Sequence, residues 1–315
     1  MMALLTIAFK QLGETRWSLI ASTLAFFSLA ILWDWGISAY QYPPEPETEP
    51  ASEVTRDDGP DAGSADDPEG QGDGDGPDGG RRRRPPGGVI YSAFGVPNDR
   101  IFAVSREDSP TLLMQVAIAN HPLIFLAVLG WAISRASAAV AGEIERGTLD
   151  LTLSRPVRRS TYLLAQILAT AIAFALLGLA LAGGHLASGW IFRLNARPGP
   201  LEYLPMVGSI AGLGLAVFGY TLPISAADLS RARAGILGLG ITLGGIAALI
   251  FARQYEDYEW VADLSAFQYH GPVGLTLEGT REQYLDLATL YGVFAAGSIL
   301  ALVLFNRRDL PSNSG

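Results

Sequence analysis

Long runs of apolar residues alternate with short polar loops along most of the chain. A helix that crosses the ~30 Å hydrocarbon layer of a bilayer needs about 20 mostly apolar residues, because backbone groups left unpaired in lipid cost several kcal/mol each. Such runs predict an all-α integral membrane protein with six transmembrane helices. The runs are Trp17–Trp33, Thr111–Ala141, Tyr162–Leu186, Pro205–Pro223, Gly235–Ala252 and Leu287–Phe305.

The second run is longer than a membrane requires. Its 31 residues would form a single helix about 46 Å long. Arg135 is the only charged residue inside it. We therefore expect the Arg135 side chain to extend to a membrane interface.

The first 16 residues have a different pattern. Leu5, Ala8, Phe9 and Leu12 recur at spacings of three and four, which predicts that residues 1–16 form an amphipathic helix on the membrane surface. A frayed start to the first span is the alternative. The first transmembrane helix is predicted over residues 17–40, and its aromatic end suits a membrane interface.

The net charge of −9 comes from one segment. Residues 41–110 hold 16 acidic and 7 basic residues, whereas the rest of the chain is neutral. Residues 43–88 are mostly Asp, Glu, Gly, Pro and Ser, which cannot bury enough apolar surface to offset the entropy of ordering. We predict an extracytoplasmic acidic loop over 41–110 that is largely disordered over 43–88. The stretch after Asp73 resembles the start of a calcium loop, but Pro77 occupies a ligand position, so a solvated linker is favoured.

The short loops between the spans indicate the orientation. One side collects eleven Lys and Arg residues and the other only four, and the positive side is normally cytoplasmic. Both termini are therefore predicted to be cytoplasmic, in a bacterial inner (plasma) membrane. Residues 111–315 form the five-helix remainder of the transmembrane domain. In this orientation, loop 253–286 is external, and its alternating aromatic and acidic residues are typical of the outer interface.

The segment after the second span carries the most local signals. Glu143 and Arg146 are spaced to pair on a helix. Gly147 is expected to end the second helix, and Thr148 to act as the N-cap of a short helix that runs through Leu153. Pro156 prevents that helix from continuing. The residues alone predict a short surface helix joined to two spans, and a simple capped hairpin is the alternative.

In this segment the chain resembles the permease subunits of type-2 ABC transporters. It is most similar to the branch that includes permeases of nitrous-oxide-reductase maturation and of gliding motility. A second, weaker similarity is the ending 305–310, whereas Gln166 stands where relatives often carry lysine. The similarity rests on Glu143, Glu145, Arg146, Gly147, Thr148, Leu149, Leu151, Leu153, Ser154, Pro156, Val157 and Arg159.

The resemblance implies a function. Residues 147–153 would be a coupling helix seated in a groove of a separate ABC ATPase subunit. Two permease chains, identical or similar, would form a translocation path above two ATPase subunits for an unidentified substrate, and export is the expected direction. The chain has no P-loop, which needs a lysine after its glycines, since its one lysine is Lys10. We expect no enzymatic activity and no cofactor in this chain, and no binding to nucleic acid.

Other chemistry has weaker support. His121, His185 and His270 are too scattered for a metal motif, and the absence of cysteine excludes disulfides and zinc-thiolate sites. Asn120 and His121 lie in an apolar run, which makes them candidate substrate-path residues; a helix start at His-Pro is the alternative. His185 and Ser188 are one turn apart, but nothing around them specifies a hydrolase site. A non-transporting membrane scaffold or sensor with an acidic ectodomain is the alternative function.

Overall fold

The computed structural model describes residues 2–41, 111–149, 158–194 and 197–308. Nearly all of the acidic loop, and Leu151, Leu153 and Pro156 of the predicted coupling segment, lie outside these residues. Within the described ranges every regular element is a helix. Six helices are long and apolar enough to span a membrane, which confirms the predicted fold class. They are α2 (Arg16–Gln41), α6 (Pro122–Ala139), α9 (Arg159–Ile191), α10 (Leu204–Ala227), α11 (Arg231–Gln254) and α13 (Arg281–Arg307).

The second apolar run is not one helix, so that prediction was wrong. It is divided into α5 (Thr111–Val116), the 3-10 helix η1 (Ala117–Asn120), α6, and the short α7 (Ala141–Glu145). The main break is at His121, which has extended backbone angles of φ −69° and ψ 134°. Pro122 causes it, because a proline has no N–H to donate and disfavours helical angles in the residue before it. The helix start at His-Pro, which was the alternative, is what the structure shows.

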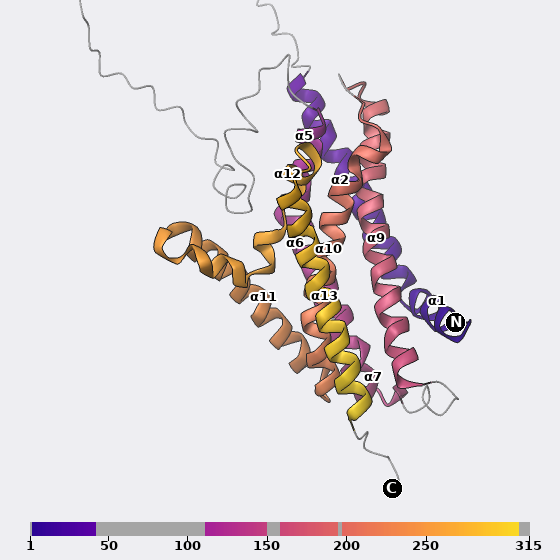
Figure 1. Ribbon diagram of the computed structural model, residues 1–315. Coiled ribbons are helices and arrows are strands. Elements are labelled where there is room, and N and C mark those ends of the chain that lie inside the picture. Colours follow the sequence, from indigo (N-terminus) through magenta and orange to yellow (C-terminus); the bar gives the residue numbers. More distant parts are fainter. Residues whose placement is uncertain (1, 42–110, 150–157, 195–196, 309–315) are drawn as a thin grey trace, which may run out of the picture.

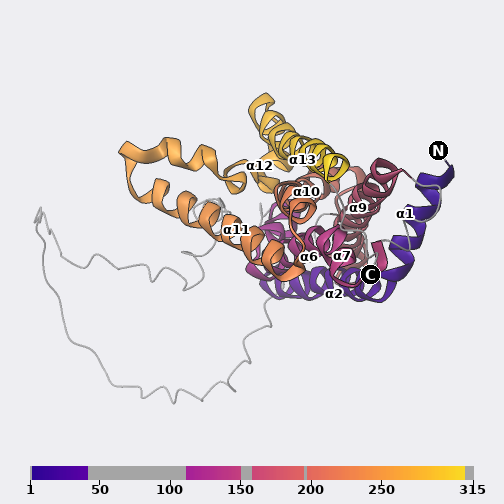
Figure 2. The same cartoon turned by 90° about the horizontal axis from the view of Figure 1, so that it is seen from below.

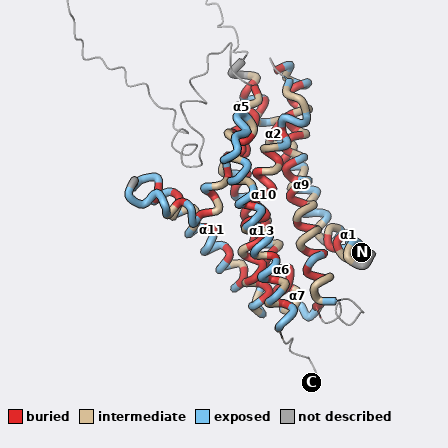
Figure 3. Tube along the Cα trace, in the orientation of Figure 1, coloured by how far each residue is buried: buried red, intermediate tan, exposed pale blue. Residues whose placement is uncertain are grey.

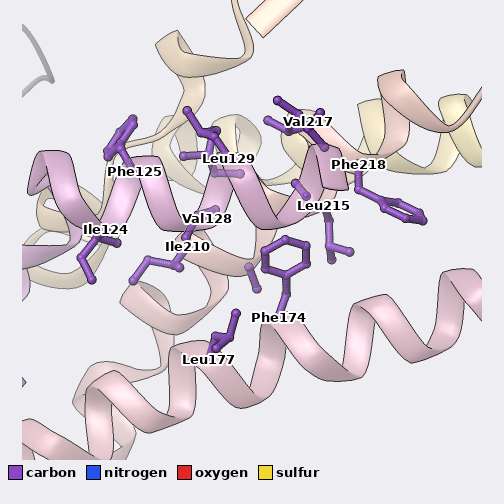
Figure 4. Packing of buried hydrophobic residues seen from close by; sticks show 14 of the residues in the cluster. Ile124, Phe125, Val128, Leu129, Phe174, Leu177, Ile210, Leu215, Val217 and Phe218 are labelled. Carbon is purple, nitrogen blue, oxygen red and sulfur yellow. The ribbon is translucent and has the colours of Figure 1, made fainter. Parts of the chain in front are cut away.

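Helix α10 is the centre of the bundle. In the most apolar window of α10, 83% of the residues are buried, compared with 22% for α11 and 17% for α13; Figure 3 shows this central helix. Phe174 of α9 points toward α10 in the core (Figure 4). A Cβ on Gly214 would lie only 2.3 Å from the Phe174 ring. Gly214 therefore makes the space that the ring fills.

The α10 helix continues past Pro223, where the sequence predicts its end. Pro223 lacks the N–H that would bond to the carbonyl of Gly219, four residues earlier. At this point α13 approaches most closely, since a Cβ on Gly297 would lie 2.0 Å from the Gly219 oxygen. Prolines are tolerated inside membrane helices where neighbouring helices cover the freed backbone. Gly297 provides that cover here.

The bundle has two distinct ends (Figure 1). We call one the α7 end; there lie α7, the starts of α9 and α11, and the ends of α10 and α13. The opposite α5 end holds α5, the 3-10 helix η2 (Pro200–Tyr203) and α12 (Pro272–Leu277). Helix α11 leans away from the bundle, as Figure 2 also shows, and η3 (Glu256–Leu264) folds back on it before η4 (Ala266–Tyr269).

The N-terminal helix α1 (Met2–Glu14) covers almost the range predicted for it. It packs against α9 near the α7 end (Figure 1). Ala8 is buried there against Ala165 and Ala169. Leu5 and Phe9 are exposed on another face of the helix. Helix α1 therefore has two apolar faces. One, with Ala8, packs against the protein, and the other, with Leu5 and Phe9, is available to contact lipid.

Candidate functional site

An exposed turn of residues 145–147 lies at the tip of the α7 end, and the ion pair that the sequence predicts is formed there. Glu143 forms the expected ion pair with Arg146. Gly147 follows with φ +68°, in the left-handed region that glycine adopts without strain. The side chains of Glu145 and Arg146 and the backbone of Gly147 are exposed. This turn is thus presented outward and is held in one shape.

One detail of the turn differs from expectation. The hydroxyl of Thr148 donates backward to Glu143 Oε2 at 2.6 Å, and its predicted role as an N-cap stays a prediction, because the residues that it would cap lie outside the described ones. Leu149, expected on an exposed surface helix, is 2% exposed and lies in the main core of this chain. Its side chain therefore anchors the segment to the permease. The helix predicted over 147–153 is described only as far as Leu149.

Helix α7 is bonded to the connection between α10 and α11. The Ser225 hydroxyl of α10 accepts from the Val140 and Ala141 N–H groups at 3.3 and 3.0 Å, and donates to Ser137 O at 3.1 Å. Glu145 Oε2 accepts from the backbone N–H of Arg231, the first residue of α11, at 2.8 Å. The start of a helix carries such unpaired N–H groups and attracts a carboxylate. The segment that carries the exposed turn is therefore joined directly to α10 and α11.

The two stretches that carry the family resemblance meet at this end. Arg159 Nη1, at the start of α9, donates to the backbone carbonyl of Arg308 at 2.5 Å. Arg308 Nη1 donates to the carbonyls of Ala226 and Asp228, at 2.8 and 2.9 Å. These carbonyls end α10, so Arg308 satisfies groups that the helix itself leaves open. The hydrogen bond from the Ser230 N–H is the largest cause that lowers the pKa of the Asp228 carboxyl, which stays charged beside Arg308.

The position of Gln166 is also explained. Gln166 Nε2 donates to the Tyr162 hydroxyl at 2.9 Å, and that hydroxyl donates to Ala139 O at 3.0 Å. Arg135 Nη2 donates to Gln166 Oε1 at 3.3 Å. A positive charge from α6 therefore reaches this residue, for which the resemblance predicts a lysine. Arg135 reaches the α7 end, as predicted from its place in the run.

The candidate substrate-path residues lie near the α5 end, and one of them, His121, has a structural role. His121 Nδ1 accepts from the Leu123 N–H at 3.3 Å, so the imidazole caps α6. Burial lowers the pKa of His121, which favours the neutral ring that such an acceptor requires. Asn120 is buried, and its Oδ1 has no hydrogen-bond partner among the described residues. A role in substrate passage stays a prediction for both.

A buried polar group around Asp34 lies at the α5 end, and the sequence analysis did not predict it. Asp34, in α2, is fully buried. Its Oδ2 accepts from Gln115 Nε2 at 2.7 Å and from the Ser188 hydroxyl, and lies 3.0 Å from His185 Nδ1. Tyr203 donates to Gln115 Oε1 at 2.6 Å. We call these five residues the Asp34 cluster. An acidic residue inside an apolar run is a signal of a buried polar site. Asp34, between Trp33 and Trp35, is such a residue and could have indicated this site.

The Asp34 cluster brings together the residue types of a hydrolytic triad without its geometry. In a triad the histidine lies between the serine and the acid, so that it can take the serine proton. Here Asp34 is central, and both Ser188 and His185 bond to it. The Ser188 hydroxyl also donates to the His185 carbonyl. The arrangement holds α2, α5 and α9 together and does not activate a nucleophile.

The comparison with protein families decides the class of protein. A family described as ABC-2 family transporter protein matches residues 15–310. The chain belongs to this family. It is therefore a multi-pass membrane permease subunit of an ABC transporter, and such subunits are non-catalytic. None of the curated proteins compared with the chain matches it.

Proposed function

We propose that this permease exports its substrate with energy from ATP hydrolysed by a separate ABC ATPase, which docks at the α7 end. This end then faces the cytoplasm of a bacterial cell, together with both termini. Two features support the orientation. The short loops of this side carry eleven basic residues against four on the other, and the exposed turn of Glu145 to Gly147 lies here.

The observation that carries the proposal is the hydrogen bond from the Arg231 N–H to Glu145. It joins the exposed turn to α11, while Ser225 joins the start of α7 to α10. Movement of the ATPase against the turn would then rotate these helices as a unit. Such rigid-body tilting is a common means of switching between two states of a transporter.

The proposal includes a second permease chain, identical or similar. Helix α11 is one of the less covered sides of the bundle, since only 22% of its most apolar window is buried and the helix leans away from the bundle (Figure 2). A Cβ added at Gly240 or Gly244 would meet nothing within 4 Å. Their spacing lets the backbone of another helix approach closely. We place the contact between the two chains on this face.

Co-expression with a candidate ABC ATPase, followed by purification of the complex and reconstitution in nanodiscs, tests the proposal. Glu145→Gln weakens the bond to α11, and a bond to a charged group contributes about 1.5–3 kcal/mol. We expect the ATPase activity of the complex to fall by roughly tenfold or more. Glu259→Gln, an exposed acid of η3, is the matched control and should have no effect.

A permease that purifies without any ATPase would contradict the proposal and favour a scaffold or sensor. So would a complex in which Glu145→Gln and Glu259→Gln behave alike. Orientation is tested separately by attaching a cysteine-reactive label to a Gly147→Cys variant in intact cells. Labelling by a membrane-impermeant reagent would place the α7 end outside and reverse the assignment.

A further inference from the structure

A cavity of about 670 Å³ opens at the α7 end, between α1 and the bundle. Its volume is in the range of ligand-binding pockets. Six helices and the connections that follow α1 and α7 contribute to its wall, so its shape depends on the packed fold. The wall is formed by Lys10, Gln11, Thr15, Ser18, Trp131, Ser134, Arg135, Ala138, Ala139, Glu143, Arg146, Thr148, Gln166 and Arg231.

The charges of this cavity are strongly unequal. Among the lining residues that the structure describes, four are basic and one, Glu143, is acidic. Glu143 pairs with Arg146 and accepts from Thr148 at the cavity edge, which offsets its charge. Among the described residues no carboxylate forms an ion pair with the Arg231 guanidinium, which instead bonds to the Ser134 hydroxyl at 3.3 Å. The cavity therefore attracts an anion.

Two of the arginines are held in position before any ligand arrives. The Arg135 guanidinium lies 5.8 Å from the centre of the Trp131 ring and bonds to Gln166. The methylenes of Arg231 pack against Gly142, where a Cβ would lie 3.3 Å from Arg231 Cδ. Arginine is suited to bind phosphate because its planar group donates several bonds at fixed angles. Holding it in place lowers the entropy cost of binding.

The cavity lies at the depth of lipid headgroups. Lys10, Thr15 and Ser18 of its wall flank Arg16 and Trp17, and the Arg16 guanidinium lies over the exposed Trp17 ring at 5.6 Å. Tryptophan and arginine side chains of this kind mark the interface of a membrane. Phe9, the neighbour of Lys10 in α1, is exposed and available to contact lipid.

We propose that this cavity binds a phosphate group, supplied by an anionic phospholipid whose headgroup enters beside α1. The acyl chains would remain in the bilayer along the exposed face of α1. The bound headgroup would join α1 to α6 and α11 and so stiffen the part of the permease nearest to the exposed turn. The inference requires the α7 end to lie at a membrane surface, but it does not require coupling to an ATPase.

The test measures lipid that stays bound to the full-length protein, with any subunits that purify with it. The protein is moved from nanodiscs of phosphatidylglycerol and phosphatidylcholine into detergent, and native mass spectrometry counts the lipids retained per permease chain. We expect one phosphatidylglycerol per chain. Arg135→Gln and Arg231→Gln should each weaken its binding by about tenfold or more, because each removes charged bonds to the phosphate. The Arg135→Lys variant, which keeps the charge, should lose less of the bound phosphatidylglycerol.

Arg233→Gln is the matched control. Arg233 is on the same helix as Arg231, but it is not part of the cavity wall and its partner is Asp228, at 3.1 Å. Its substitution should leave lipid retention unchanged. Melting temperatures of all variants separate loss of binding from loss of fold. Equal loss of phosphatidylglycerol from the Arg231 and Arg233 variants would overturn the proposal.

A second arm distinguishes the lipid from a soluble phosphate compound. Inorganic phosphate is added to protein in neutral phosphatidylcholine nanodiscs, and its binding is measured by calorimetry. Binding that is lost in Arg231→Gln and not in Arg233→Gln would support a phosphate site with a soluble source. If neither phosphatidylglycerol nor inorganic phosphate binds in a way that depends on Arg135 and Arg231, the cavity is not a phosphate site. That result would leave the proposed ATPase coupling untouched.

Discussion

The two ends of this permease use polar groups in opposite ways. In the Asp34 cluster one carboxylate is fully buried, and every contact is made by groups from the surrounding helices. At the α7 end, the described part of the wall of an open cavity has three more basic than acidic residues. The first arrangement is closed, and several groups bond to its carboxylate, although His185 Nε2 has no partner among the described residues. The second arrangement is open, and basic residues are in excess in its described wall.

This difference separates stability from binding. A buried charge is costly unless it is hydrogen-bonded and paired, so the Asp34 cluster must keep all of its partners to exist. An excess of one charge persists where water or a ligand can reach it. We therefore expect substitutions at the α5 end to act on folding and those at the α7 end to act on function.

The largest loss of stability is expected from Asp34→Ala. It leaves the donors of Gln115, Ser188 and His185 buried without their acceptor, and breaking a buried pair in this way costs about 3–5 kcal/mol. Chemical unfolding in detergent micelles measures the change. Asp257→Ala, in the exposed part of η3, is the control and should change little. A loss below 1 kcal/mol for Asp34→Ala would mean that water reaches the cluster and that it is not closed.

Acid should weaken the α5 end selectively. His270 packs against Phe125 and bonds to Ser209, and burial lowers the pKa of its ring from 6.5 to about 4. The unfolded state then takes up a proton at a higher pH than the folded state. Stability is complete above pH 6.5 and is lost as the pH falls toward 4, by about 3 kcal/mol in total. The free energy of unfolding, measured between these two pH values, should no longer depend on pH in this way in the His270→Gln variant. An unchanged pH dependence would mean that another group causes it.

Glycine substitutions compare the packing of the two ends directly. A Cβ on Gly184 of α9 would lie 2.5 Å from the Phe27 carbonyl of α2, next to the Asp34 cluster, so Gly184→Ala should cost about 1–3 kcal/mol. A Cβ on Gly142 of α7 would meet side-chain atoms only, Arg231 Cδ at 3.3 Å and Ala138 Cβ at 3.5 Å. Gly142→Ala should be neutral or slightly stabilising, because alanine favours a helix. The melting temperatures of the two variants measure this difference in packing. A similar decrease in melting temperature for both variants would show that the two ends are packed equally tightly at these glycines.

The sequence predicts the six spans because length and apolar composition alone decide which segments can cross a membrane. It does not predict which of them is central, since the buried α10 is less apolar in its spanning window than the more exposed α13. The Glu143–Arg146 pair is local and could be foreseen. Ser225, Arg231 and Arg308 could not, because each bonds across 80 or more residues of chain. The burial of Leu149 in the core likewise depends on contacts that only the folded chain makes.

The smallest loss of stability, and the sharpest contrast, is expected from Glu143→Gln. Its ion pair with Arg146 is at the surface, where the Arg146 side chain is 49% exposed, and such pairs contribute about 0.2–1 kcal/mol. Unfolding should therefore change by less than about 1 kcal/mol. The same carboxylate orders the exposed turn through Arg146 and Thr148, so the ATPase activity of the complex should fall several-fold. If unfolding instead changed as much as it does for Asp34→Ala, the α7 end would be as closed as the α5 end, and coupling would have to use a surface other than this turn.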